Sequence, residues 1–163
     1  MKKIFILPVI IISIISCSQQ SSNTQSLQNQ IDSLQEKLSQ VYKPGFGEFM
    51  GYIQAHHEKL WYAGQHENWK LAGFEMDEIK ETFENIQKYE TDRPETKLLP
   101  MIKASLDSVT TAIGQQNPAK FKNSFTMLTN TCNTCHLAAK FEFNVVKIPD
   151  MQTFSNQDFK PAQ

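Results

Sequence analysis

The chain has 163 residues, of which 40% are hydrophobic and 20% charged, and its formal net charge is -1. This composition is typical of a folded globular protein and excludes collagen-like, fully disordered and multi-span membrane chains. Lysines and arginines form no long run, and the near-neutral charge argues against nucleic-acid binding, which requires a clustered basic surface. Three cysteines are too few for a disulfide scaffold.

The N-terminus has the pattern of an export signal. Lys2 and Lys3 precede a predominantly apolar run over residues 4–15. A basic segment followed by an apolar run too short to span a bilayer is typical of a signal peptide. Because Cys17 follows this run closely, the segment resembles a bacterial lipoprotein signal. The resemblance implies that residues 1–16 are removed and that Cys17 becomes the lipidated first residue of the mature chain.

A lipid on Cys17 would anchor the mature protein to the bacterial cell envelope. Stable anchoring takes more than one acyl chain, because each buried methylene group contributes only about 0.8 kcal/mol. We therefore expect a lipid-anchored protein at the periplasmic face. The outer membrane is favoured over the inner one because Ser18 after the cysteine resembles lipoprotein sorting patterns. The alternative is an ordinary cleaved signal followed by a chance cysteine.

Two short segments connect this anchor to the rest of the chain. Residues 18–26 contain no apolar side chain, which predicts a solvated, flexible tether. An apolar seam at helical spacing follows, formed by Leu27, Ile31, Leu34, Leu38 and Val41. The seam covers about two heptads, whereas a coiled coil typically needs three or four. We therefore expect residues 17–45 to form a tether and a spacer helix that rests on its own domain, rather than a dimeric stalk.

Four amphipathic segments follow from Phe46 onward, each with apolar residues at helical spacing. The first is expected to end near Gly64 as a C-terminal cap, and the second to open at Asn68, a favourable N-terminal cap. The third should carry Pro100 in its first turn. The fourth opens at Asn117, which a proline follows directly.

These segments predict an all-α fold. Because their connections are short, we expect an antiparallel four-helix bundle over residues 46–140. Residues 141–163 contain scattered apolar side chains and are expected to form an irregular C-terminal tail that packs on the bundle. The predicted order is therefore a signal peptide, a tether with a spacer helix, a helical bundle and a tail.

The most specific pattern in the chain is Cys132-Asn133-Thr134-Cys135-His136, because C-x-x-C-H is the attachment sequence of c-type haem. Two thiols one helical turn apart can each bond to one vinyl group of the porphyrin, and the adjacent imidazole can reach the iron. We therefore expect one covalent haem c, held by Cys132 and Cys135 through thioethers, with His136 as the proximal axial ligand.

Three other chemistries use a C-x-x-C pair. A structural zinc site normally needs four ligands, and the chain has no second cysteine pair. A thioredoxin-like redox pair lies beside a βαβ unit, which this sequence does not predict. A structural disulfide across so short a loop on a helix would be strained. The pattern and the export signal together favour haem attachment.

An attachment motif on the last helix of an exported four-helix bundle resembles the class II c-type cytochromes, the cytochrome c′ and c-556 group. The resemblance covers about residues 46–140, and Cys132, Cys135 and His136 match the family motif directly. Residues 137–163 form a longer ending than is usual in the family. The resemblance implies a haem between the helices, which transfers electrons or, when its sixth coordination site is vacant, binds NO or CO.

The sixth iron ligand is expected from the first helix of the bundle. Because this helix should run antiparallel to the last one, its N-terminal half lies at the level of His136. His57 lies within roughly 20° of the centre of the apolar face, and we expect it to be the distal ligand. Met50 also faces inward and is the second candidate, although a methionine on a helical stripe is usually core filling. His56, roughly 80° from that centre, is the third candidate.

Together these features predict a membrane-anchored monohaem cytochrome c that carries electrons in the cell envelope and is not an enzyme. Its expected partners are redox proteins, and a homodimer would fit the family. One alternative is a five-coordinate haem protein that binds NO or CO. The second alternative is a haem-free envelope lipoprotein whose bundle mediates protein contacts.

Overall fold

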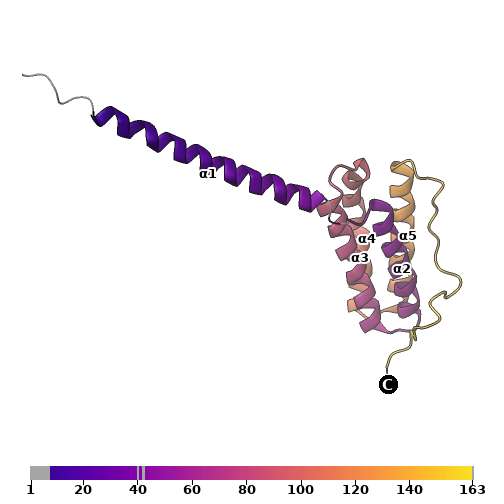
Figure 1. Cartoon of the computed structure of the whole chain (residues 1–163). Coiled ribbons are helices and arrows are strands. Elements are labelled where there is room, and N and C mark those ends of the chain that lie inside the picture. The colour runs from indigo at the N-terminus through magenta and orange to yellow at the C-terminus, as the bar shows by residue number, and fades with distance from the viewer. Residues whose placement is uncertain (1–7, 40, 42, 163) are drawn as a thin grey trace, which may run out of the picture. The chain divides into compact units, whose positions relative to one another are not determined.

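The computed structural model describes residues 8–39, 41 and 43–162, and the chain divides into two units, Met1–Lys43 and Pro44–Gln163. The first unit contains α1 (Pro8–Ser39). The second contains α2 (Phe46–Gln65), α3 (Trp69–Tyr89), the 3₁₀ segment η1 (Pro94–Ile102), α4 (Lys103–Gly114) and α5 (Pro118–Ala138) (Figure 1). No strand occurs among the described residues, so the predicted all-α class is confirmed.

Helix α1 covers more of the N-terminal region than the sequence predicts. It runs without interruption through residues 18–26, the segment expected to be a flexible tether. Serine, glutamine and asparagine have only moderate helix propensity, but no glycine or proline lies between Pro8 and Pro44 to end a helix once it has formed. The five apolar side chains of the predicted seam are exposed.

Only part of the predicted membrane anchor lies within the described part of the chain. Residues 1–7 of the expected signal peptide and the side chain of Cys17 lie outside the described residues. Among the described residues, none of the helices combines the length and the apolar character that crossing a membrane requires.

Two of the predicted helix starts are confirmed in atomic detail. The side chain of Asn68 accepts a hydrogen bond from the backbone N–H of Leu71 (3.2 Å), and α3 begins at the next residue after Asn68. The side chain of Asn117 accepts one from the N–H of Lys120 (2.9 Å), and Pro118 opens α5. Each side-chain oxygen satisfies a backbone N–H that has no partner within its helix.

The third predicted helix begins later than expected, and Pro100 lies before it rather than in its first turn. Residues Pro94–Ile102, including Pro100, form the 3₁₀ segment η1, and regular α-helix begins only at Lys103. A proline lacks the N–H that an α-helix interior uses, and its ring clashes with the carbonyl four residues earlier. The α-helix therefore cannot extend back through Pro100, and short 3₁₀ turns occupy this stretch instead.

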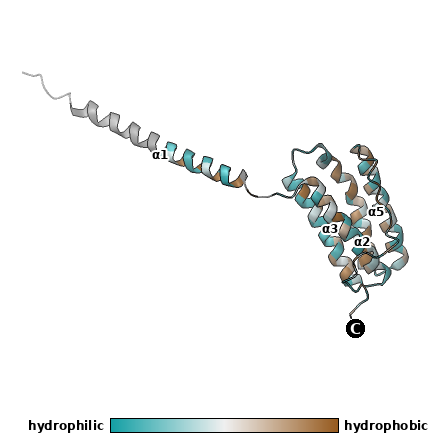
Figure 2. Ribbon diagram, turned by 45° about the vertical axis from the view of Figure 1, so that its right-hand side comes forward, coloured by the Kyte–Doolittle hydropathy of each residue, from teal (hydrophilic) through white to brown (hydrophobic). Residues whose placement is uncertain are grey.

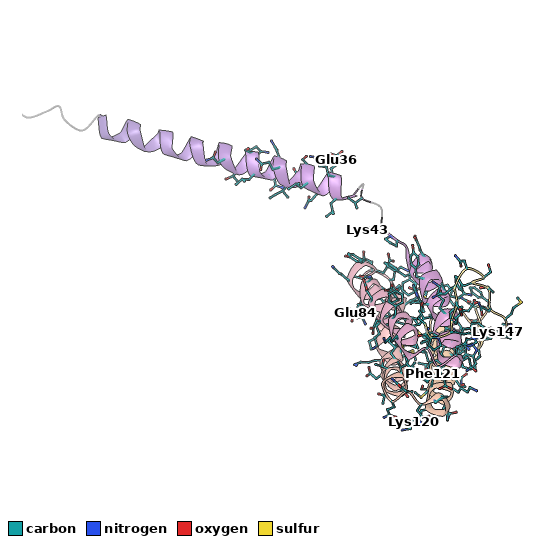
Figure 3. The ribbon with its side chains drawn as sticks, turned by 90° about the horizontal axis from the view of Figure 1, so that it is seen from below. Glu36, Lys43, Glu84, Lys120, Phe121 and Lys147 are labelled. Atoms are coloured by element: carbon teal, nitrogen blue, oxygen red, sulfur yellow. The ribbon has the colours of Figure 1, made fainter. Side chains whose placement is uncertain are left out.

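Helices α2 to α5 bury their apolar faces against one another. α2 packs on α3, α3 on α4, α4 on α5 and α5 on α2. Hydrophobic and hydrophilic residues recur along each of these helices (Figure 2), as expected for helices with one apolar face. Phe121 lies inside the unit, whereas the charged Glu84, Lys120 and Lys147 lie at its periphery (Figure 3). The core draws on all four helices and includes Phe49, Leu60, Met76, Ile79, Val109, Phe121 and Phe125.

The C-terminal tail runs back along the helical unit (Figure 1). The carboxylate of Glu58 accepts hydrogen bonds from the backbone N–H and the hydroxyl of Thr153 (2.6 and 2.9 Å). Farther along, the Phe159 ring is 2% exposed and packs on Tyr62 with centroids 5.7 Å apart. The tail therefore packs alongside α2.

Helices α2 and α5 approach each other closely at Gly64. The sequence predicts a C-terminal cap at this glycine, but Gly64 lies inside α2, and the left-handed residue that follows the helix is Glu67 (φ 56°). A Cβ atom on Gly64 would lie 2.1 Å from Cε1 of Phe121. The close packing of the two helices, rather than the backbone conformation, therefore requires a glycine here.

Substitution of Gly64 by alanine should destabilise the protein by about 2–3 kcal/mol, because the methyl group overlaps the buried Phe121 ring. Gly73→Ala is the matched control. Gly73 lies inside α3, and nothing lies within 4 Å of the Cβ atom it would gain. The control should stabilise the protein by about 0.5–1 kcal/mol, because glycine is unfavourable within a helix. Urea unfolding of both variants checks this, and equal effects would contradict the packing argument.

Candidate haem-attachment site

Cys132, Cys135 and His136 lie in the last two turns of α5. Cys132 packs against the core, and both cysteines are free thiols. Burial raises the pKa of Cys132 to about 12, with the charge of Cys135 as a smaller cause, and burial also raises the pKa of Cys135. At neutral pH the motif therefore presents two neutral thiols on consecutive turns of one helix.

Cys132 and Cys135 lie at a different position along their helix from the cysteines of typical thiol–disulfide redox pairs. Reactive redox cysteines have lowered pKa values and often lie at helix N-termini, where the helix dipole stabilises the thiolate. Cys132 and Cys135 lie near the C-terminal end of α5, where the dipole has the opposite effect. Thioether formation uses the reduced thiol, since each S–H adds across a carbon–carbon double bond. The arrangement therefore favours thioether chemistry over a redox pair.

A hydrogen bond to the tail determines which nitrogen of His136 is available. Nδ1 of His136 lies 2.6 Å from the carbonyl oxygen of Asn144. Because a carbonyl oxygen can only accept, Nδ1 carries the proton and donates it. In the neutral ring, Nε2 then keeps its lone pair, as an iron ligand requires.

In His57, the expected distal ligand, the proton lies on Nε2, whereas in His136 it lies on Nδ1. Its ring is 5% exposed, and Nε2 lies 2.9 Å from Oγ1 of Thr129. Thr129 already donates its hydroxyl proton to the carbonyl of Phe125 (3.0 Å), so its oxygen accepts and Nε2 of His57 carries the proton. Burial lowers the pKa of His57 to about 4. The ring is therefore neutral at neutral pH, with Nε2 engaged.

His56, the third distal candidate, contacts α3. Its Nδ1 lies 2.6 Å from Oε2 of Glu75, whose side chain is 1% exposed, and its Nε2 lies 4.0 Å from Oε2 of Glu78. The sequence analysis did not single out Glu75. Its spacing from Ala72 and Ile79 places it on the apolar face of α3, which is the signal that could have identified it. His56 is thus engaged with a buried carboxylate.

Contacts between α2 and α5 show that these two helices run in opposite directions. Residues farther along α2 contact residues nearer the start of α5. The pairs are His57 with Thr129, Trp61 with Phe125, and Gly64 with Phe121.

Continued toward the start of α2, this register places Met50 at the level of His136. Met50 is half-buried and packs against the core. His57 bonds instead to Thr129, which lies about two turns, or about 10 Å, from His136 along α5. Two nitrogen ligands on opposite sides of one metal ion are only about 4 Å apart, since metal–imidazole bonds are about 2 Å long. The register therefore favours Met50 over His57 for the distal position.

The surroundings of the motif fit an apolar cofactor. Leu137 directly follows the motif, Phe143 and Val145 lie in the tail after α5, and the three side chains are 64%, 79% and 71% exposed. A group of exposed apolar side chains typically marks a surface that something else covers. Exposed apolar side chains on the motif helix and in the tail that follows it are compatible with an apolar ligand. Two thiols and one imidazole are the protein groups that covalent attachment and iron ligation of a c-type haem use.

Asn133 and Asn144 belong to this site but were not singled out from the sequence. Asn133 makes two hydrogen bonds to the backbone of Val146, and Asn144 offers its backbone carbonyl to His136. Backbone partners carry no residue-type signal, so a single sequence does not reveal these contacts.

Other parts of the chain offer weaker candidate sites. A shallow depression of about 580 Å³ on α3 has a charged and amide lining that includes none of the predicted site residues. In the part of the chain that the structure describes, no three His, Cys, Asp or Glu side chains converge as a metal site. Comparison of the chain with models of protein families, with curated proteins and with solved structures finds no match.

The depressed pKa of His57 should make the protein less stable in acid. Between about pH 6.5 and about pH 4 the unfolded chain binds a proton at His57 and the folded chain does not, so the free energy of unfolding falls as the pH falls. The loss attributable to His57 is on the order of 3 kcal/mol. Urea unfolding across this range should show a shallower pH dependence for His57→Gln than for the wild type.

His66→Gln is the control for this measurement. His66 is exposed at the end of α2, and the variant should keep the wild-type pH dependence. A His57→Gln protein whose stability falls as steeply in acid as that of the wild type would contradict the assignment of a buried, neutral His57.

Proposed function

We propose that this protein is a lipid-anchored monohaem c-type cytochrome that carries electrons at the periplasmic face of a bacterial cell envelope. Cys132 and Cys135 would hold the haem, His136 would be its proximal ligand, and Cys17 would carry the lipid. Bound there, haem supplies an iron that gains or loses one electron. In the same proposal, α2 to α5 form an antiparallel four-helix bundle.

The state of three side chains at the end of α5 carries this proposal. Cys132 and Cys135 are reduced, neutral thiols, and His136 donates its Nδ1 proton to the tail, which leaves the Nε2 lone pair free. Thioether formation needs the first property and iron ligation the second. The opposite directions of α2 and α5 and the packing of each helix on the next support the bundle.

The position of Met50 supports electron transfer over gas binding. Met50 lies at the level of His136 in the α2–α5 register and belongs to the half-buried layer around the core. A His–Met pair gives a six-coordinate iron, and the methionine raises the reduction potential. Binding of NO or CO needs an open sixth position instead. We therefore expect Met50 to complete the iron coordination. His57 is the second candidate.

Covalent haem binding can be tested in a bacterial host that is competent in cytochrome c maturation. The full chain should give reduced protein with sharp low-spin α and β absorption bands and an intact mass that includes one haem and the acyl groups. The double variant Cys132→Ala/Cys135→Ala should be colourless, because it lacks both attachment points. Cys17→Ala is the matched control at the third cysteine, and it should keep the haem and lose the lipid.

A colourless wild-type protein with the mass of the bare acylated chain would contradict the proposed function. Such a result would leave the haem-free envelope lipoprotein as the better interpretation. A coloured protein with a high-spin spectrum that shifts on addition of CO would instead support the gas-binding alternative.

The distal ligand can be assigned with two variants of the haem-loaded protein. Met50→Ala should convert the low-spin spectrum to a high-spin spectrum that responds to CO, because it removes the side chain level with His136. His57→Gln should leave the spectrum unchanged, since the glutamine amide can still donate to Thr129. A low-spin spectrum that survives Met50→Ala and is lost in His57→Gln would assign the ligand to His57.

A further inference from the structure

The C-terminal tail closes back on the motif helix immediately after α5. Lys140 has a left-handed backbone (φ 62°) that reverses the chain, and the N–H of Phe141 donates to the carbonyl of His136 (2.8 Å). The N–H of Asn144 donates to the carbonyl of Phe141 (2.9 Å), while the carbonyl of Asn144 accepts from Nδ1 of His136. The start of the tail is therefore a tight loop that ends on the imidazole.

Asn133, the first residue between the two cysteines, holds this loop in place. Its Nδ2 donates to the carbonyl of Val146 (2.8 Å), and its Oδ1 accepts from the N–H of Val146 (2.8 Å). Both ends of the amide thus bind the same backbone residue, which fixes the position and the direction of the chain there. Val146 lies two residues beyond Asn144, so this pair of hydrogen bonds holds the carbonyl on which His136 depends.

Building on the proposed function, we propose that Asn133 is a positioning residue for the proximal iron ligand. By holding the tail, it keeps the carbonyl of Asn144 on Nδ1 of His136. This contact fixes the orientation of the imidazole and makes Nε2 a stronger electron donor. A stronger donor stabilises ferric iron relative to ferrous iron, so the contact lowers the reduction potential.

The two hydrogen bonds between Asn133 and Val146 are not the only contacts that hold the tail against the helices. Thr153, Phe159 and Lys160 make further contacts, with α2 and with the residue that caps α3. Loss of the Asn133 amide should therefore loosen the loop beside His136 while the rest of the tail stays docked. This separates a local effect on the ligand from a general loss of structure.

Haem-loaded Asn133→Ala and Asn133→Asp proteins test this role against the wild type. Alanine removes both hydrogen bonds to Val146, whereas aspartate keeps only the acceptor for its N–H. We expect the reduction potential to rise in the alanine variant, whereas the carboxylate charge of the aspartate variant itself favours ferric iron and opposes a rise. In reduced, isotope-labelled protein, the Nδ1 proton of His136 should exchange with water about tenfold faster or more in the alanine variant, because its acceptor is no longer held.

Two substitutions serve as controls. Thr134→Ala changes the other residue between the cysteines, which is exposed and bonds through its hydroxyl to the carbonyl of Asn130 within α5 (3.0 Å). Thr153→Val weakens the tail at a different contact. Both controls should keep the wild-type potential and the wild-type exchange rate of the His136 proton.

The outcomes separate this inference from the proposed function. An Asn133→Ala protein with full haem content and with unchanged potential and exchange rate would overturn the inference alone. If the alanine variant does not fold, the exchange rate of the His136 proton in the aspartate variant decides, and an unchanged rate would overturn the inference. A wild-type protein without haem would overturn the proposed function and the inference together.

Discussion

The register between α2 and α5 is the constraint on which the candidate site depends. It is fixed where Gly64 allows the Phe121 ring to lie against the backbone of α2, and where Trp61 and Phe125 pack with ring centroids 4.8 Å apart. Because cores are close-packed, a slide of one turn between the helices would remove these contacts together. The same register decides which side chain of α2 lies level with His136, although that level is about four turns away.

His57 and His136 show that the hydrogen-bond partner decides which ring nitrogen of a neutral imidazole carries the proton and which keeps its lone pair. At His57 the partner is the hydroxyl of Thr129, which has already donated its proton and accepts from Nε2. At His136 the partner is the carbonyl of Asn144, which accepts from Nδ1 and leaves Nε2 free. Burial lowers the pKa of His57 and keeps that ring neutral within the core.

Features with local causes could be predicted from the sequence. Asn68 and Asn117 cap the helices that follow them, and the C-x-x-C-H motif falls on one helix. The periodicity of apolar residues also placed His57 on a buried face, but it could not give the level of His57 against α5. A helical pattern gives a direction around the helix axis, whereas the level follows from packing with a partner. Nor does apolar spacing distinguish the 3₁₀ segment Pro94–Ile102 from an α-helix.

The tail provides the hydrogen-bond acceptor for Nδ1 of His136, which α5 itself cannot provide. The helix ends at Ala138, two residues after His136, so no further turn exists to offer an acceptor on that side. The chain instead reverses at Lys140, where a left-handed conformation costs a residue other than glycine about 1 kcal/mol. The hydrogen bond from Phe141 to His136 and the two bonds of Asn133 offset this cost. The start of the C-terminal tail thus forms part of the candidate site.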